Sequence, residues 1–181
     1  MRLRAGLAPL AAAAAGLLQA MSLAWPAGGQ PLWWLQLLSL AGLAALLQRA
    51  AGWKGAALLG WIFATAWLTA TFWWLFISMH VYGGLASPLA AAAVVLLAAF
   101  LSLYYAAAAG LYARARAGRT WREGVLFAAL WLGAELLRGT LFTGFPWGAG
   151  GYAHVDRARA CVVPTARVSR NAIAAPTAPM P

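Results

Sequence analysis

Five long apolar segments follow one another along this chain, and they constrain its fold more than any other feature. They span residues 6–25, 32–48, 55–79, 89–112 and 121–137. A helix needs about 20 mostly apolar residues to cross the hydrocarbon core of a bilayer, and about 17 is the short limit. Helices satisfy their own backbone hydrogen bonds, which irregular chain in lipid cannot do. The pattern therefore predicts an all-α membrane protein with about five transmembrane helices within residues 1–150.

The composition excludes a water-soluble globule and argues against nucleic-acid binding. Of the 181 residues, 64% are hydrophobic and 9% are charged, which leaves too few polar side chains for a hydrated surface. The net charge is +10, but the basic residues lie singly or in small groups between apolar runs rather than along one helical face. The single cysteine, Cys161, excludes an intramolecular disulfide and a cysteine-based metal site.

Positive charge recurs at every second break between the apolar segments. Arg2 and Arg4 precede the first segment, Arg49 and Lys54 follow the second, and four arginines lie between residues 114 and 122. The other breaks, residues 26–31 and 80–88, contain no Lys, Arg, Asp or Glu. The positive-inside rule then predicts a cytoplasmic N-terminus, with residues 80–88 and everything after the fifth segment outside. A cleaved signal peptide is the alternative interpretation of the first segment.

Small and aromatic residues in the third segment favour packing and anchoring over ligand binding. Gly60, Ala64, Ala66 and Ala70 supply the small-xxx-small spacings that allow two helices to approach closely. Trp73 and Trp74 lie near the predicted outer end of that segment, where indole rings favour the headgroup layer.

The acidic residues are so few that each can be weighed as a catalytic candidate. Glu123 lies at the start of the fifth helix beside Arg122, where a carboxylate suits the positive helix end, so we interpret it as a capping charge. Glu135 lies three residues before Arg138, and this spacing places both on one helix face. Charges at membrane depth mark function or a specific pairing. Because the position is peripheral in the helix, we predict a structural Glu135–Arg138 pair.

The remaining candidates also favour structural roles. His80 follows the third helix without a carboxylate or second histidine near it in sequence, so we expect an interfacial structural histidine. Cys161 is the tempting nucleophile, but a reactive thiolate needs a cationic environment and an ordered pocket. Its stretch of sequence shows no fold signal. We therefore predict no catalytic, cofactor-binding or metal-binding residue in this chain.

The string TGFPWG, residues 143–148, predicts a helix exit followed by an aromatic anchor, because Pro146 forces the preceding Phe145 into an extended conformation. With its neighbours it forms ELLRGTLFTGFPWGAGGYAHVD, residues 135–156, which closely resembles a block of the bacterial apolipoprotein N-acyltransferases. The third segment also resembles that family in its ending, which Trp74, Ser78, Tyr82, Gly83 and Gly84 fit. The fourth segment is similar as well, and the resemblance covers residues 1–156.

The resemblance implies a multi-pass enzyme of the bacterial inner membrane. Such an enzyme transfers a fatty acyl chain from a membrane phospholipid to the free α-amino group of the diacylglyceryl-cysteine of an apolipoprotein, without a cofactor. The family's fold has eight membrane helices and a periplasmic nitrilase-like α/β domain, which holds its catalytic Glu, Lys and Cys. A thiolate nucleophile suits this chemistry, because a thioester intermediate divides the transfer into two easier steps.

The chain departs from the family pattern after its fifth segment. No position matches the catalytic Glu, Lys or Cys: we place Lys54, the single lysine, in a cytoplasmic loop, and Cys161 lacks the family's context. We therefore expect the nitrilase-like domain to be absent and the chain to be inactive alone.

After Asp156 the family typically continues Gly-Pro-Leu, whereas this chain reads Arg-Ala-Arg-Ala. We interpret residues 151–181 as an exposed, disordered tail that is out of frame after Asp156. Two alternatives are a small multi-pass membrane protein that binds lipid or assists a partner, and a fragment of a transporter.

Overall fold

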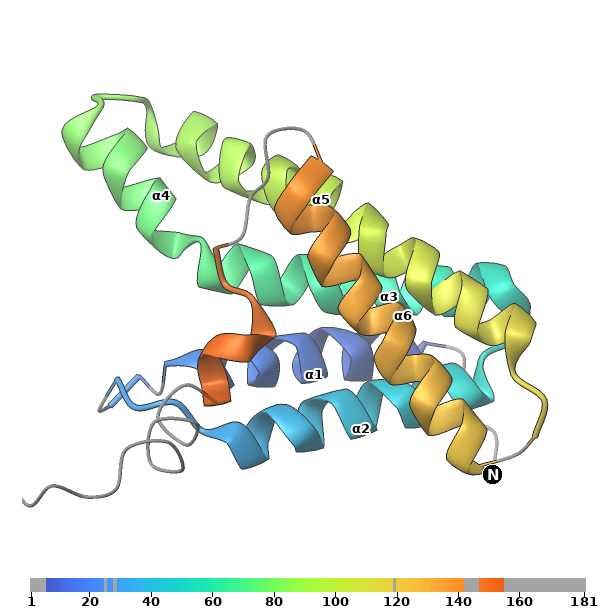
Figure 1. The fold of residues 1–181 in the computed structure, drawn as a ribbon. Coiled ribbons are helices and arrows are strands. Elements are labelled where there is room, and N and C mark those ends of the chain that lie inside the picture. Colours follow the sequence, from blue (N-terminus) through green and yellow to red (C-terminus); the bar gives the residue numbers. More distant parts are fainter. Residues whose placement is uncertain (1–5, 25, 28, 119, 142–146, 155–181) are drawn as a thin grey trace, which may run out of the picture.

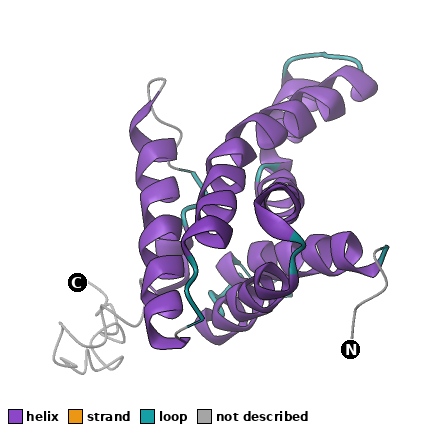
Figure 2. Ribbon diagram, turned by 90° about the vertical axis from the view of Figure 1, so that its right-hand side faces the viewer, coloured by secondary structure: helices purple, strands orange, loops and turns teal. Residues whose placement is uncertain are grey.

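The computed structural model describes residues 6–24, 26–27, 29–118, 120–141 and 147–154. The part of the chain so described is helical and contains no strand, as Figure 2 shows. Its α-helices are α1 (Leu7–Leu23), α2 (Trp33–Arg49), α3 (Gly52–Thr71), α4 (Trp73–Ile77), α5 (Ser87–Ala115) and α6 (Thr120–Thr140). A π-helical turn, η1 (Ser78–Tyr82), continues α4, and a 3₁₀ turn, η3 (Gly150–His154), follows α6. The all-α prediction agrees with this architecture.

The third predicted segment is not one straight helix. It divides at Phe72 into α3 and the α4–η1 helix, whose axes differ by 51°. Phe72 has φ −91° and ψ 14°, outside the helical range, and its side chain is fully buried. The hydroxyl of Thr71 donates to the carbonyl oxygen of Trp67 at 2.9 Å, a bond to the preceding turn that often bends helices. The segment predicted over residues 55–79 is therefore bent and runs on to Tyr82, and its interpretation as a single span stays a prediction.

Length and hydropathy single out fewer spanning helices than five. Among the described residues, α5 is long and apolar enough to cross a bilayer, and the bent pair of α3 with α4–η1 qualifies as a second span if it is counted as one. Helix α1 is apolar but shorter, with 17 residues.

Helix α3 lies at the centre of the bundle, with α1 and α5 packed along it, and α6 crosses α5 diagonally (Figure 1). Two glycines allow these close approaches. A Cβ atom on Gly60 of α3 would lie 2.6 Å from the Cβ atom of Ala109 and 3.0 Å from the carbonyl oxygen of Tyr105, both on α5. A Cβ atom on Gly16 of α1 would overlap the carbonyl oxygen of Phe63 on α3. Gly60 thus belongs to a close helix contact, as its spacing predicted.

Aromatic side chains fill the space between α3, α5 and α6. Trp67 and Tyr105 are fully buried and meet edge to face, with ring centroids 5.4 Å apart. Trp131 of α6 stacks on Trp67 at 6.0 Å and meets Tyr105 at 4.8 Å. Such pairs add about 0.5–1.5 kcal/mol each beyond the burial of their area. These two tryptophans therefore pack within the bundle.

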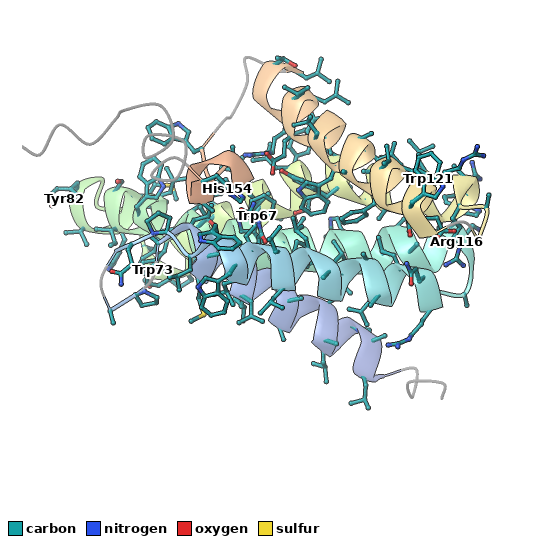
Figure 3. All side chains as sticks on the ribbon, turned by 60° about the horizontal axis from the view of Figure 1, so that its bottom comes forward. Trp67, Trp73, Tyr82, Arg116, Trp121 and His154 are labelled. Carbon is teal, nitrogen blue, oxygen red and sulfur yellow. The ribbon has the colours of Figure 1, made fainter. Side chains whose placement is uncertain are left out.

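The two ends of the bundle differ in charge. Arg116 and Trp121 lie toward one end, whereas Trp73, Tyr82 and His154 lie toward the other (Figure 3). At the first end, Arg116 donates to the carbonyl oxygens of Leu47 at 3.0 Å and Gln48 at 2.6 Å. These carbonyls belong to the last turn of α2, where a cation both satisfies free acceptors and suits the helix dipole. Arg116 therefore joins the end of α5 to the end of α2.

Candidate functional site

The segment that follows α6 folds back onto the opposite end of the bundle. Residues 147–154 lie against the ends of α1 and α2, in orange-red at the lower left of Figure 1. Gly148 has φ 73°, which favours glycine, and a Cβ atom there would lie 2.6 Å from Cγ2 of Thr71. This tight passage directs the chain into η3. We call residues 147–154 the return segment.

Gly150 is the point where the return segment meets three helices. Its N–H donates to Oε1 of Glu135 on α6 at 3.1 Å, and its carbonyl oxygen accepts from Nε2 of Gln36 on α2 at 3.0 Å. A Cβ atom at this position would lie 2.5 Å from Nε2 of Gln36 and 2.9 Å from Oε1 of Glu135. A glycine is therefore required for both side chains to reach the backbone.

Arg138 holds the other end of the return segment from inside the bundle. It is 1% exposed. Its Nε donates to the hydroxyl of Tyr105 at 3.0 Å, and one terminal nitrogen donates to the carbonyl oxygen of Trp147 at 2.9 Å. Arg138 lies in the last turn of α6, near the helix end as expected, but α5 and the return segment cover its guanidinium. Glu135 and Arg138 share a helix face, since both contact residues 147–150, and a direct pair between them stays a prediction.

Two buried amides were missed by the sequence analysis. Gln19 on α1 is fully buried, and neither its amide oxygen nor its amide nitrogen has a hydrogen-bond partner among the described residues. Its nitrogen would lie 3.8 Å from a Cβ atom on Gly150. Gln36 on α2 is 5% exposed, and its Oε1 also has no partner within the described chain. The available signal was a glutamine in the interior of each of two mostly apolar segments, because polar side chains in membrane helices usually find partners across helices.

A groove runs between α2 and α6 from this polar cluster. Its volume is about 400 Å³. Leucine, alanine and aromatic side chains form its walls, and Gln36, Glu135, Gly150 and His154 lie at one end. Pockets of this size with mostly apolar walls and a few polar groups are typical of ligand sites. We call it the α2–α6 groove.

The other candidate residues make local contacts. Oε1 of Glu123 accepts from the N–H of Gly118 at 2.7 Å, so this carboxylate holds the loop before α6. Nδ1 of His80 lies 2.8 Å from the carbonyl oxygen of Leu85, across the turn before α5. Both arrangements fit the structural roles expected for these side chains.

Lys54 lies in the first turn of α3 rather than in a loop, which corrects the predicted placement. The helix begins at Gly52, whose φ of 86° turns the chain directly after α2. Nζ of Lys54 is 5.8 Å from the ring centroid of Trp53, and the guanidinium of Arg114 lies 4.1 Å from the same ring. These cation–π contacts gather positive charge at the end of the bundle that holds Arg116.

Trp73, Trp74 and Trp147 are exposed, at 57%, 44% and 57%, and the rings of Trp74 and Trp147 lie 5.8 Å apart. Cys161, residues 143–146 and the junction after Asp156 lie outside the described residues. Within the described ranges no three His, Cys, Asp or Glu side chains gather as a metal site would require.

The geometry of the cluster around Gly150 gives it two capacities. It fastens the return segment, and it presents acceptor oxygens at the end of an apolar groove.

Comparison with known proteins places this helical region in a family. A sequence model described as "Apolipoprotein N-acyltransferase N-terminal domain" matches residues 15–164. The apolipoprotein N-acyltransferase of Verminephrobacter eiseniae is 65% identical over 146 residues, which cover 78% of this chain and 27% of that protein. The corresponding protein of Ralstonia nicotianae is 50% identical over 68% of this chain and 24% of its own length. That of Pseudomonas putida is 40% identical over 74% of this chain. The chain thus spans about a quarter of the length of these curated relatives.

Proposed function

We propose that this chain, which belongs to the apolipoprotein N-acyltransferase family, forms part of the membrane portion of a lipoprotein-modifying enzyme. The complete enzyme transfers a fatty acyl chain from a membrane phospholipid to the α-amino group of the N-terminal diacylglyceryl-cysteine of an apolipoprotein. The observation that carries the proposal is the family match over residues 15–164, together with 65% identity to the Verminephrobacter protein.

The catalytic groups of this reaction lie outside residues 6–154 in our proposal. The hydrogen bonds made by two charged side chains, Glu135 and Arg138, support this part of the proposal. Glu135 accepts from the backbone of Gly150, and Arg138 donates to Tyr105 and Trp147, so both hold the return segment. Acyl transfer through a covalent intermediate needs a nucleophile beside a base, and these groups are arranged for fastening instead. The described helices therefore serve as scaffold for groups supplied by the rest of the enzyme.

The chain crosses the bacterial inner membrane several times in this proposal, with the N-terminus in the cytoplasm. With α3 and α4–η1 taken as one bent helix, successive helices run in alternating directions between the two ends of the bundle (Figure 1). Arg49 and Arg114 lie in the last turns of α2 and α5, and Lys54 and Arg122 lie in the first turns of α3 and α6. Arg116 lies in the loop before α6. Cytoplasmic loops carry such an excess of positive charge. Five spans follow if the bent pair of α3 with α4–η1 counts as one, and α1 and α2, at 17 residues each, meet the short limit of about 17.

Replacement of part of a relative tests the family function directly. Residues 1–156 of this chain would be joined to the remainder of the Verminephrobacter enzyme and expressed in bacteria depleted of their own N-acyltransferase. We expect the chimera to restore growth and lipoprotein acylation, because 65% identity preserves the helix contacts. A chimera that reaches the membrane at the level of the parent enzyme but restores neither would contradict the proposal.

A further inference from the structure

A second groove lies at the cationic end of the bundle, between the start of α3 and the last turns of α5. Most of its lining is small or apolar: Ala57, Ala106, Ala107, Gly110 and Leu111. The lining residues of α5 are spaced three or four apart, so they share one helix face, and Arg114 is the last of them. Trp53, in the first turn of α3, lies beside Arg114. We call this the α3–α5 groove.

The guanidinium of Arg114 is placed to bind an anion at the end of this groove. It lies 4.1 Å from the ring centroid of Trp53. Within the described part of the chain, Arg114 has no hydrogen-bond or ion-pair partner. Stacking occupies the face of a guanidinium, whereas its N–H donors project from the edge, in its plane. Such an edge can donate to two oxygen atoms of one phosphate group.

The neighbouring charges leave an excess of positive charge beside the groove. Arg116 donates to carbonyl oxygens at the end of α2, and the carboxylate of Glu123 accepts from a backbone N–H. Nζ of Lys54 lies 5.8 Å from the ring centroid of Trp53, so two cations border the same indole. An occupant of the groove therefore meets positive charge at one end and apolar surface along the rest.

We propose that the α3–α5 groove binds an anionic lipid, whose phosphate contacts Arg114 and Lys54 and whose hydrocarbon chain lies along α5. Basic pockets between membrane helices on the cytoplasmic side bind anionic headgroups, and the topology proposed above places this end at the cytoplasmic leaflet. A free phosphate ion would satisfy the cations but would leave the apolar part of the groove unused, which favours the lipid.

This lipid differs from the acyl donor of the proposed reaction. The groove selects for negative charge rather than for an acyl chain to be transferred, and it lies at the opposite end of the bundle from the return segment. The site rests on the membrane location proposed above and is independent of acyl transfer. The bound lipid is therefore a component that stays with the protein, holding α3 and α5 together at their cytoplasmic ends.

Photo-crosslinking tests the site. The full 181-residue chain would be reconstituted in phosphatidylcholine nanodiscs with a trace of phosphatidylglycerol that carries a diazirine in one acyl chain. Labelled residues would be mapped by mass spectrometry. We expect labels within residues 106–111, which line the groove on α5. Unlabelled phosphatidylglycerol should displace the probe at a concentration at which phosphatidylethanolamine does not, because the latter carries no net charge.

Two arginines provide matched variants for the headgroup contact. Arg114→Gln and Arg122→Gln each remove one positive charge from the same end, and each guanidinium lies over a tryptophan ring, but Arg122 does not line the groove. We expect Arg114→Gln to lower labelling about fivefold, as for one cation near an anionic headgroup, and Arg122→Gln to lower it less than about twofold. Arg114→Lys should retain part of the labelling, because it keeps the charge but loses the paired donors.

A second pair of variants tests the apolar part of the groove. Ala107 is exposed and lines the groove, whereas Ala92 is exposed on the same helix and does not. The substitution Ala107→Phe places a ring in the groove and should abolish the labels. Ala92→Phe should preserve them.

Three results would overturn the assignment. Equal labelling of the Arg114→Gln and Arg122→Gln proteins would show that net charge, rather than this site, attracts the probe. Displacement by phosphatidylethanolamine as effective as that by phosphatidylglycerol would remove the selection for negative charge. Displacement by inorganic phosphate would assign Arg114 to a free anion. None of these measurements requires turnover, so each is separable from a failure of the proposed enzymatic function.

Discussion

Gly150 shows how one position can join distant parts of a membrane protein. Its backbone N–H and carbonyl oxygen satisfy a carboxylate on α6 and an amide on α2, which lie 15 and 114 residues away in sequence. The missing side chain makes both contacts possible. Buried polar groups are costly unless they are hydrogen-bonded, so this glycine determines whether Glu135 and Gln36 are tolerated inside the bundle.

The first prediction concerns that missing side chain. The substitution Gly150→Ala places a methyl group 2.5 Å from Nε2 of Gln36. We expect it to break at least one of the two hydrogen bonds and to destabilise the protein by about 1–3 kcal/mol, as overpacking typically does. Thermal unfolding in detergent measures this loss. Gly151→Ala is the matched control, because a Cβ atom there meets no atom within 4 Å. Equal melting temperatures for the two variants would contradict the role assigned to Gly150.

A second prediction follows from the buried guanidinium. The substitution Tyr105→Phe keeps the ring among its aromatic neighbours but removes the acceptor for Nε of Arg138. Hydrogen bonds to charged groups contribute about 1.5–3 kcal/mol, and a buried donor without a partner adds a desolvation cost. The melting temperature of the variant should therefore fall, and limited proteolysis should cut residues 147–154 faster. Unchanged stability together with unchanged proteolysis would show that Tyr105 does not hold Arg138 in place.

Among the helices, α3 decides the architecture because both α1 and α5 pack along it. Its small residues were visible in the sequence, and so was the approach of another helix at Gly60. The bend at Phe72 was not predicted, because it arises from a hydroxyl bond within the helix and from burial of the Phe72 ring against other elements. A hydropathy pattern contains neither cause, since the first is a local side-chain hydrogen bond and the second is a tertiary contact.

The third prediction addresses the contact between α3 and α5. The substitution Gly60→Ala brings a methyl group within 2.6 Å of the Cβ atom of Ala109, so the helices must separate. We expect a loss of about 1–3 kcal/mol, despite the better helix propensity of alanine. Gly133→Ala on α6 is the control, because its Cβ atom would meet nothing within 4 Å, and propensity alone should stabilise it by up to about 1 kcal/mol. If Gly60→Ala is as stable as Gly133→Ala, the close packing described for α3 is incorrect.

The whole molecule is a helical bundle whose two ends carry different kinds of side chain. Cations cluster where α2 and α5 end, whereas the return segment and the exposed Trp73 and Trp74 lie at the other end. The sequence was sufficient to predict the all-α class, the alternation of charge and the family, since each depends on long patterns or on a specific motif. The sequence did not predict the polar cluster around Gly150. Gln19, Gln36 and Gly150 come together only through the folding of the return segment, and nothing in their spacing indicates that meeting.

The fourth prediction concerns orientation in the membrane. Single cysteines introduced at Gly84 and Gly118, in a background with Cys161→Ser, occupy loops at opposite ends of the bundle. A membrane-impermeant thiol reagent added to intact spheroplasts should label the cysteine at position 84 and spare the one at position 118 until the membrane is opened. The positive-inside rule is the reason for this expectation. The reverse labelling pattern would invert the proposed topology.

Mass spectrometry of a lipoprotein N-terminus provides the most direct test of the proposed function. The substrate would be a diacylglyceryl-cysteine lipoprotein incubated with phospholipid and the purified chimera of residues 1–156 with the remainder of the Verminephrobacter enzyme. We predict a mass increase of one acyl group on the N-terminal peptide with the chimera and no increase with the 181-residue chain alone. A folded chimera that leaves the peptide diacylated, or acylation by the chain alone, would contradict the role of these helices as the scaffold of an N-acyltransferase.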